Sequence, residues 1–422
     1  MKIKDIKAYE LLDSRGNPTV GVEVFLSDGS TGLALVPSGA STGKYEAIER
    51  RDSEKDRYLG KGVLDAVNSI HKEILPLLRE KDASDLFGND LIMVEADGTD
   101  TKRNFGANAI LGVSLACAKA AASSMKINLH EYINNKASEF YDRKTEQRLP
   151  IPMLNILNGG AHADNPIDFQ EFMIRPYKFN SFSDSLRCGV EIFHTLKRTL
   201  EDKNLNTSVG DEGGFAPNLD TPESALDLIM ESIEKAGYKP GEEVNLCLDV
   251  AATEFYSDSI YKINGKGELN SNEMIDYLKT LKSSYPIHSI EDGLDEDDWQ
   301  GWKVLTEELG SKTQLVGDDL FVTNTARIKR GIEEGSANSV LIKVNQIGSL
   351  SETFQAIKLS EENNFKNIIS HRSGETEDAF IADLSVGMGV GQIKTGAPSR
   401  SDRVAKYNRL LMIEKNSSIC FG

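Results

Sequence analysis

The sequence predicts an α/β protein in which a barrel of β and α units follows a smaller α+β domain. In the C-terminal half, short apolar runs recur roughly every 25–40 residues with amphipathic helical stretches between them, which is the spacing of a (β/α) barrel. The N-terminal segment instead alternates apolar and polar positions between turn signals, as antiparallel strands do. With 422 residues, the chain is long enough for a full barrel and a second domain.

The N-terminal segment predicts a meander of about three antiparallel strands. Apolar residues alternate with polar ones through 3–8 and 20–26, and they recur in 33–36. The turn residues Arg15-Gly16-Asn17-Pro18 and Ser27-Asp28-Gly29 separate these runs. We therefore expect three short strands joined by tight turns.

Helical patterning follows the predicted strands. Apolar positions recur at helical spacing over 61–80, and 107–123 is Ala-rich and apolar around most of its circumference, as in a helix packed on both sides. Strands followed by helices indicate an α+β domain, which we place at residues 1–133. The polar and charged stretch 134–148 is predicted to be a linker.

The barrel, residues 149–422, begins irregularly. Two strand-like runs, 149–157 and 168–176, are separated only by a loop, and helical stretches at about 180–203 and 221–236 precede the next strand. A short loop cannot carry a parallel crossover, so the second strand should be antiparallel to the first. The predicted order is ββαα(βα)₆, a modified TIM-like barrel.

The later apolar runs each end at a residue with chemical potential: Asp249, Glu291, Asp318, Lys343, His371 and Lys394. In (β/α) barrels the active site lies at the C-terminal ends of the strands, so these side chains should share one centre. Carboxylates on three successive strands are hard oxygen donors and predict a Mg²⁺ or Mn²⁺ site. The acids just past the strands fit helix caps better: Asp292, Asp295 and Asp319.

Two lysines lie opposite this predicted metal site. Lys343 follows the apolar run 340–342 and should point into the barrel mouth. Close to a metal ion and a second lysine, its pKa is expected to fall, which makes it a candidate general base. Lys394 has the same setting; one of the two lysines is expected to stay charged and bind an anionic group.

Three further residues are candidates for an acid partner of the lysine base. Glu212 stands between glycines in VGDEGG, and Glu171 follows Gln170 on the second barrel strand. His162 lies in a glycine-rich loop after the first strand. Alone, the VGDEGG motif also fits an acidic surface turn and His162 an ordinary loop histidine; the facing lysines favour the catalytic interpretation.

Two polar segments are candidates for binding an anion. Arg372 and Ser373 follow His371 at a strand end, and an arginine beside a hydroxyl is a common phosphate clamp. The Gly/Ser/Thr-rich stretch 37–47 does not match the P-loop pattern, so ATP is not implied. We expect its part 37–43 to be a lid that moves over the barrel mouth.

The composition limits the classes of partner. The formal net charge of −18 argues against nucleic-acid binding and against attraction to acidic membranes. The four cysteines form no CxxC pair, so a reduced cytoplasmic protein is expected. The N-terminus lacks the apolar core of a signal peptide, and no apolar run approaches the ~20 residues that span a bilayer.

Long strings of this sequence resemble the enolase family, and the resemblance covers essentially the whole chain. The matching strings are DSRGNPTV (13–20), SGASTG (38–43), NGGAHADN (158–165), QEF (170–172), VGDEGG (209–214), SIEDGLDEDDW (289–299), LVGDDLFVTN (315–324), LIKVNQIGS (341–349), SHRSGETED (370–378), QIKTG (392–396) and SRSDRVAKYN (399–408). Several of these strings are long enough to be specific alone.

The resemblance implies a Mg²⁺-dependent enzyme that reversibly dehydrates 2-phosphoglycerate to phosphoenolpyruvate in glycolysis and gluconeogenesis. It implies that Asp249, Glu291 and Asp318 hold a first Mg²⁺. Ser41 of the lid would help hold a second Mg²⁺ that arrives with the substrate. Lys343 would remove the C2 proton.

The other implied roles surround the substrate. Glu212, supported by Glu171, would assist departure of the C3 hydroxyl, and His162 would take part in catalysis. The implied substrate-binding residues are His162, Gln170, Glu171, Arg372, Ser373, His371 and Lys394. The family also implies homodimers, sometimes assembled into octamers.

Two alternatives remain open at this point. Another acid dehydratase or a racemase of the same superfamily usually carries a base on the second barrel strand, often within Lys-x-Lys, whereas that strand here reads DFQEFMIRP without lysine. A surface or scaffold protein belongs to a different class, and an intact catalytic cup argues against it as the sole function.

Overall fold

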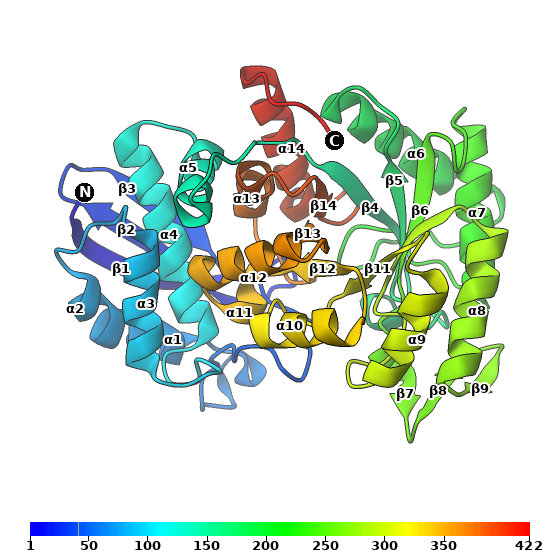
Figure 1. The fold of residues 1–422 in the computed structure, drawn as a ribbon, viewed down its shortest axis with the longest axis horizontal. Helices are drawn as coiled ribbons and strands as arrows, with labels where there is room; N and C mark the ends of the chain where they lie inside the picture. The colour runs from blue at the N-terminus through cyan, green and yellow to red at the C-terminus, as the bar shows by residue number, and fades with distance from the viewer. Residues whose placement is uncertain (41) are drawn as a thin grey trace.

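The computed structural model describes residues 1–40 and 42–422, and two domains lie side by side in it (Figure 1). In the N-terminal domain, strands β1 (Ile3–Leu12), β2 (Pro18–Leu26) and β3 (Thr31–Leu35) form an antiparallel sheet in the order β1-β2-β3, so the predicted meander is confirmed. The long helix α4 (Ala107–Met125) packs on this sheet. The contact is so close that a Cβ at Gly32 would lie 2.3 Å from the backbone nitrogen of Ala120.

The described part of the N-terminal domain has six other helical segments. They are η1 (Arg57–Gly60), α1 (Leu64–Ser69), η2 (Ile70–Ile74), α2 (Leu75–Leu78), α3 (Leu86–Asp97) and α5 (Leu129–Tyr141). Of these, α1, η2, α3 and α5 contact α4. The region predicted to be helical over 61–80 thus forms consecutive turns from Leu64 to Leu78, with a π-helical turn directly before the α2 segment that contains Pro76. Proline has no N–H to donate, and a wider turn accommodates this loss.

The linker predicted over 134–148 begins later than expected. Residues 134–141 belong to α5, so that part of the prediction is wrong. Asn128 and Glu131 form a capping box that starts the helix, and Ile133 and Ala137 are fully buried on its inner face. A buried face and a strong cap outweigh the polar composition of the segment.

The second domain is a closed barrel. Its strands are β4 (Ile151–Asn158), β5 (Glu171–Pro176), β6 (Val244–Asp249), β10 (Ile287–Glu291), β11 (Gln314–Gly317), β12 (Ser339–Ile342), β13 (Lys366–Ser370) and β14 (Gln392–Lys394). β5 is antiparallel to both of its neighbours, β4 and β6, and the other pairs are parallel. The modified TIM-like fold predicted from the sequence is therefore confirmed.

Helices cover the outside of the barrel in the predicted order (Figure 1). They are α6 (Phe182–Asp202), α7 (Pro222–Lys235), α8 (Ser271–Ser284), α9 (Trp299–Leu309), α10 (Thr325–Glu334), α11 (Val344–Ile347), α12 (Leu350–Glu362), α13 (Phe380–Met388) and α14 (Ser401–Asn416), with short turns η3 (Gly160–His162) and η4 (Ala252–Phe255). A small sheet, β7 (Tyr256–Ser257), β8 (Ile260–Ile263) and β9 (Gly267–Leu269), is inserted between β6 and α8 and was not predicted.

An apolar layer divides the barrel interior. It consists of Met153, Met173, Cys247, Val316, Leu341 and Ile368, which are all essentially inaccessible. The layer lies between a polar layer at the N-terminal ends of the parallel strands and the charged groups at their C-terminal ends. The two mouths of the barrel are therefore separate chemical environments.

No single described helix is long and apolar enough to cross a membrane. Helices α4 and α5 meet that criterion only as a pair, and they are bent by 105° at the break between them.

Candidate active site

Strand register brings the predicted acids together at the C-terminal mouth of the barrel. Asp249 is the register partner of Glu171 on β5 and of Glu291 on β10, so three carboxylates lie side by side. Asp318 directly follows β11, the next strand. All four residues are buried. The reversed direction of β5 is what places its first residue, Glu171, at this mouth.

Lys394 lies among three of these carboxylates. Its Nζ is 2.8 Å from Glu291, 3.1 Å from Asp249 and 3.1 Å from Glu171. Burial opposes the ammonium charge, but Asp249 and Glu171 hold the pKa of Lys394 well above its usual value. This lysine therefore remains charged, in line with the expectation that one of the two lysines does so.

The expected fall in the pKa of Lys343 is not found. Burial lowers the pKa of Lys343, yet the neighbouring Asp318 carboxylate outweighs burial, and the net shift is upward. The Lys343 ammonium pairs directly with Asp318 Oδ2. The ion pair with Asp318 therefore outweighs the second lysine, Lys394, which acts to lower the pKa of Lys343.

The carboxylates at this mouth could bind a divalent cation, because they are oxygen donors and some of their oxygens have no hydrogen-bond partner among the described residues. Among the described residues, Glu291 Oε2 and Glu171 Oε2 are buried oxygens without a hydrogen-bond partner. Buried carboxylate oxygens are stabilised by a cation, and an all-oxygen donor set suits Mg²⁺. The predicted trio of Asp249, Glu291 and Asp318 surrounds the Lys394 and Lys343 ammonium groups, so an ion at this position would compete with them.

Two tighter groups of potential ligands also occur at this mouth. Ligand atoms lie within 4.8 Å of one another in His162, Glu171 and Glu212, and in Asp292, Asp318 and Asp319. Asp292 does not cap a helix as expected: its two oxygens accept the backbone N–H groups of Asp318 and Asp319 at 2.9 and 2.8 Å. It therefore orients the turn that presents Asp318.

The pKa values of Glu171 and Glu212 are shifted in opposite directions. Burial and the nearby Glu212 carboxylate raise the pKa of Glu171 well above its usual value. Burial also disfavours the charge on Glu212, but His371 and His162 outweigh burial and hold the pKa of Glu212 well below its usual value. Neighbouring carboxyls with pKa values moved apart serve as one proton donor and one anion.

Polar contacts fix Glu212 in this position. Asn155 Nδ2 donates to its Oε2 at 2.9 Å, and His371 Nε2 lies 3.4 Å from the same oxygen. His162 Nδ1 is 3.7 Å from both Glu171 and Glu212. The glycines of the loop allow close packing, since a Cβ at Gly214 would lie 2.8 Å from the carbonyl oxygen of Asn155.

The predicted anion clamp contacts the stretch 37–47, which contains the predicted lid. Arg372 Nη1 donates to Glu46 Oε2 at 2.9 Å, and the Ala40 N–H donates to Ser373 Oγ at 2.6 Å. Backbone hydrogen bonds also join Ser38 and Gly374. The segments on either side of residue 41 thus lie on the barrel mouth, whereas Ser41, the predicted ligand of a second Mg²⁺, is outside the described residues.

Arg403, which was not predicted from the sequence, also belongs to this site. The buried guanidinium of Arg403, on α14, donates to His371 Nδ1 and to the carbonyl oxygens of Arg372, Ser373 and Asp211. A guanidinium only donates, so His371 carries its proton on Nε2, which faces Glu212. The string SRSDRVAKYN contains Arg403, but a position inside a helical pattern gives no local signal of such a role.

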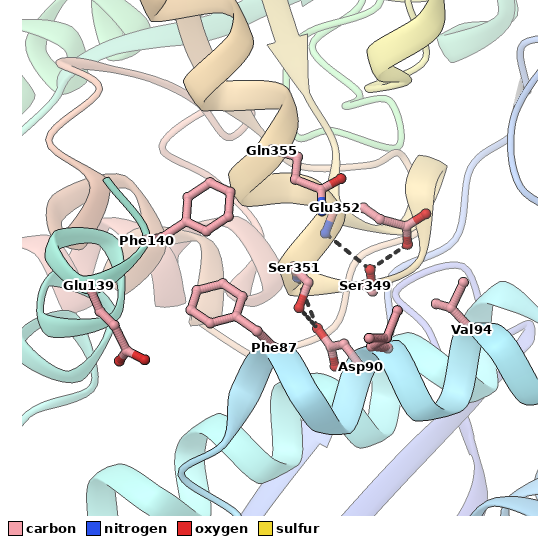
Figure 2. Close-up of a pocket in the computed structure, with 10 residues that line it drawn as sticks. Phe87, Asp90, Val94, Glu139, Phe140, Ser349, Ser351, Glu352 and Gln355 are labelled. Carbon is pink, nitrogen blue, oxygen red and sulfur yellow. Dashed lines mark hydrogen bonds between the residues drawn. The ribbon is translucent and has the colours of Figure 1, made fainter. Parts of the chain in front are cut away.

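The predicted catalytic and binding residues line one small cavity of about 20 Å³: His162, Gln170, Glu171, Glu212, Lys343, His371, Arg372, Ser373 and Lys394. Gln170 Nε2 also donates to Asp249 Oδ2 at 3.3 Å. A cavity of about 630 Å³ lies elsewhere, among α3, α5 and α12, where Ser351 hydrogen-bonds Asp90 beside the rings of Phe87 and Phe140 (Figure 2). The smaller cavity is the candidate active site because the perturbed charges converge there.

Two family models match the chain. The model described as "Enolase, N-terminal domain" matches residues 3–133. The model described as "Enolase, C-terminal TIM barrel domain" matches residues 146–419. Together these two matches span nearly all of the sequence.

Proposed function

The chain belongs to the enolase family through both of its domains, and we propose that it acts as the Mg²⁺-dependent lyase that dehydrates 2-phospho-D-glycerate to phosphoenolpyruvate. One observation carries the proposal. Lys343 lies on one side of the buried active-site cavity, and Glu171 and Glu212 lie on the other side. The pKa of Glu171 is raised and that of Glu212 is lowered. Strands β12 and β5, which set these walls, lie on opposite sides of the closed barrel.

The lysine is placed to remove a proton next to a carboxylate. The Lys343 ammonium, which Asp318 stabilises in the free protein, must first release a proton to solvent, and the neutral amine then accepts the proton from C2 of the substrate. Asp249, Glu291 and Asp318 would hold Mg²⁺, which supplies positive charge to the substrate carboxylate. Lys394, with its raised pKa, adds a fixed cation beside the same group.

Glu171 and Glu212, on the side of the cavity opposite Lys343, would assist departure of the C3 hydroxyl. The proton on Glu171 and the anionic Glu212 form a relay that delivers a proton to the C3 oxygen, so that water rather than hydroxide departs. Burial lowers the pKa of both His371 and His162, and the Glu212 carboxylate opposes that shift in each ring. The two rings and the Glu212 anion therefore stabilise one another on this side of the cavity.

The phosphate would lie between the barrel and the lid. Arg372 offers a buried guanidinium, and Ser373 offers a hydroxyl that already contacts the lid backbone at Ala40. A phosphate bound by Arg372 would compete with Glu46 for the guanidinium and so couple the substrate to the lid. Ser41 adjoins this position in sequence, and we propose it as a ligand of a second Mg²⁺.

Other acid dehydratases and racemases of the superfamily are a weaker second candidate. They usually require a base on the second barrel strand, and β5 carries Glu171 and Arg175 but no lysine. Substrate choice can be tested by following phosphoenolpyruvate absorbance with 2-phosphoglycerate and keto-acid formation with unphosphorylated sugar acids, each with and without Mg²⁺. Turnover of a sugar acid in preference to 2-phosphoglycerate would refute the proposal. Cytoplasmic location and dimeric or octameric assembly stay predictions.

A further inference from the structure

A second polar cavity lies at the N-terminal mouth of the barrel, across the apolar layer from the candidate active site. Its volume is about 350 Å³, and its lining includes His288, Lys312, Thr313, Gln314, Asn338 and Lys366. These residues lie at or just before the starts of β10, β11, β12 and β13. The cavity therefore belongs to the face that the proposed reaction does not use.

The charges around this cavity are of one sign. Its described lining contains no carboxylate, although the whole chain has a net charge of −18. Burial, and then the positive charges of Arg175, Lys366 and Lys282, lower the pKa of His288 to about 4. Within residues 1–40 and 42–422, none of these four side chains forms an ion pair.

Two buried donors at this mouth lack partners. Thr313 is 4 % exposed and lines the cavity, yet its Oγ1 has no hydrogen-bond partner among the described residues. Arg175 Nε is likewise buried and unpaired in the described part of the chain, and the guanidinium otherwise only stacks over the Tyr177 ring at 5.4 Å. Leaving a buried donor or a partly buried cation without an acceptor is costly, so these groups indicate a missing anionic partner.

Helix capping does not account for this arrangement. Lys312 and Lys366 do follow the ends of α9 and α12, where basic residues favourably meet the helix dipole. At α9, however, Asn338 Nδ2 already donates to the carbonyl oxygens of Gly310 and Thr313. Capping gives no reason for the Arg175 guanidinium or for the unpaired hydroxyl of Thr313.

The floor of the cavity is polar and closed. Gln314 Nε2 donates to Ser289 Oγ at 3.1 Å and to Gln392 Oε1 at 3.2 Å, and Gln392 Nε2 donates back to Gln314 Oε1 at 2.9 Å. The amide groups satisfy one another, so they do not compete for a ligand. A ligand here would reach the cationic side chains without entering the apolar interior.

We infer that this mouth binds a small phosphate-bearing anion, held by Lys312, Lys366 and the Thr313 hydroxyl, with Arg175 supplying further positive charge and the His288 ring lining the site. The volume is at the small end of ligand sites, which suits a phosphate group with a short substituent or none. Three features favour phosphate over a carboxylate: several separate cationic donors, a hydroxyl donor, and the absence of an acid among the described lining residues.

The test is a titration followed by NMR of the histidine rings in the intact protein. The chain has six histidines, and the His288 signal is assigned by its loss in His288→Gln. Inorganic phosphate should shift the His288 signal saturably, while His162 and His371 report separately on the active site. Glycerol 3-phosphate forms a second arm: tighter binding than inorganic phosphate would identify a phosphate monoester as the ligand, and weaker binding would identify the free ion.

Variants decide whether the site is built for the anion. Arg175→Leu combined with Lys366→Gln should weaken phosphate binding, read at His288, at least about tenfold, while the response at His371 stays unchanged. Lys303→Gln, an exposed lysine of the same α9 helix, is the control and should retain full affinity. A non-saturating His288 response, or equal affinity in the double variant and the control, would overturn the inference.

Discussion

Charged side chains have opposite surroundings at the two mouths of the barrel. At the C-terminal mouth, Lys394 and Lys343 each touch carboxylates at hydrogen-bond distance. At the N-terminal mouth, Arg175 and Lys366 gather without a carboxylate partner among the described residues. Both mouths are built on the same strands, so strand geometry alone does not determine the chemistry. Closely paired acids and bases are suited to moving protons, whereas unpaired cations are suited to holding an anion.

The largest expected effect follows from removing the proposed base at the C-terminal mouth. Lys343→Ala should lower turnover by about 10³-fold or more, because proton abstraction at C2 is lost. Exchange of the C2 hydrogen with solvent deuterium, followed by NMR, should disappear with it. The exposed Lys329 on α10 provides the control, since Lys329→Ala should behave as wild type. Exchange at the normal rate in Lys343→Ala would remove Lys343 from this role.

Removing the anion on the opposite wall should separate the two half-reactions. Glu212→Gln keeps the hydrogen bonds of the side chain but removes its charge, so dehydration should fall by about 10²–10⁴-fold. Exchange at C2 should persist because Lys343 is untouched. The measurements are product absorbance and deuterium incorporation on one sample. Parallel loss of both would show that acid and base act as a single unit.

A smaller effect is expected from the residue that positions His371. Arg403→Met should lower kcat about 10–100-fold, because the Glu212 and Arg372 loops lose their common anchor. Nitrogen-15 NMR should show that His371 no longer holds its proton only on Nε2. Arg403→Lys should restore part of both losses. Arg409→Met, on the same helix but paired with Asp383, is the control. An unchanged tautomer in Arg403→Met would reduce Arg403 to a packing role.

The smallest expected effect is on the stability of the fold at acidic pH, through His288 at the N-terminal mouth. The folded-state pKa of His288, about 4, lies below its unfolded value of 6.5. Between these values the unfolded chain binds more protons, so stability is lost as the pH falls from about 6.5 to about 4. His288→Gln should reduce this loss by roughly 1–2 kcal/mol, measured by urea unfolding at several pH values. A variant with the same pH profile as wild type would contradict the shift and weaken the contrast between the mouths.

Features that depend on a short stretch of sequence were predictable, and contacts between distant segments were not. The ends of apolar runs predicted where Asp249 and Lys343 would lie, since strand direction alone carries such residues to one mouth. The contacts among those residues were not predictable: Lys394 lies against Asp249 because β14 and β6 curve toward each other in a closed barrel. Arg403 comes from the last helix and contacts residues at least 30 positions earlier, so no short window of sequence reveals its role.

The end of α5 and the cavity at the N-terminal mouth were not predicted for the same reason: both depend on contacts between distant segments. Residues 134–141 look like a linker in composition, but a capping box and two buried side chains decide that they are helical. Arg175 follows the apolar residues 172–174, and His288 is one of three polar residues in β10, so neither position alone signals a shared site. Their shared location requires the register of β5, β6 and β10.

The reversed strand β5 also has a consequence for insertions and deletions. Because it runs against its neighbours, its six residues place Glu171 at one mouth and Arg175 toward the other. Side chains alternate between faces along a strand, so one added or removed residue would exchange its inward and outward positions and displace both charges at once. A library of single-residue insertions should therefore tolerate changes in the exposed turns of β7–β9 but none within 171–176. This short strand is expected to be the segment of the barrel whose length can vary least.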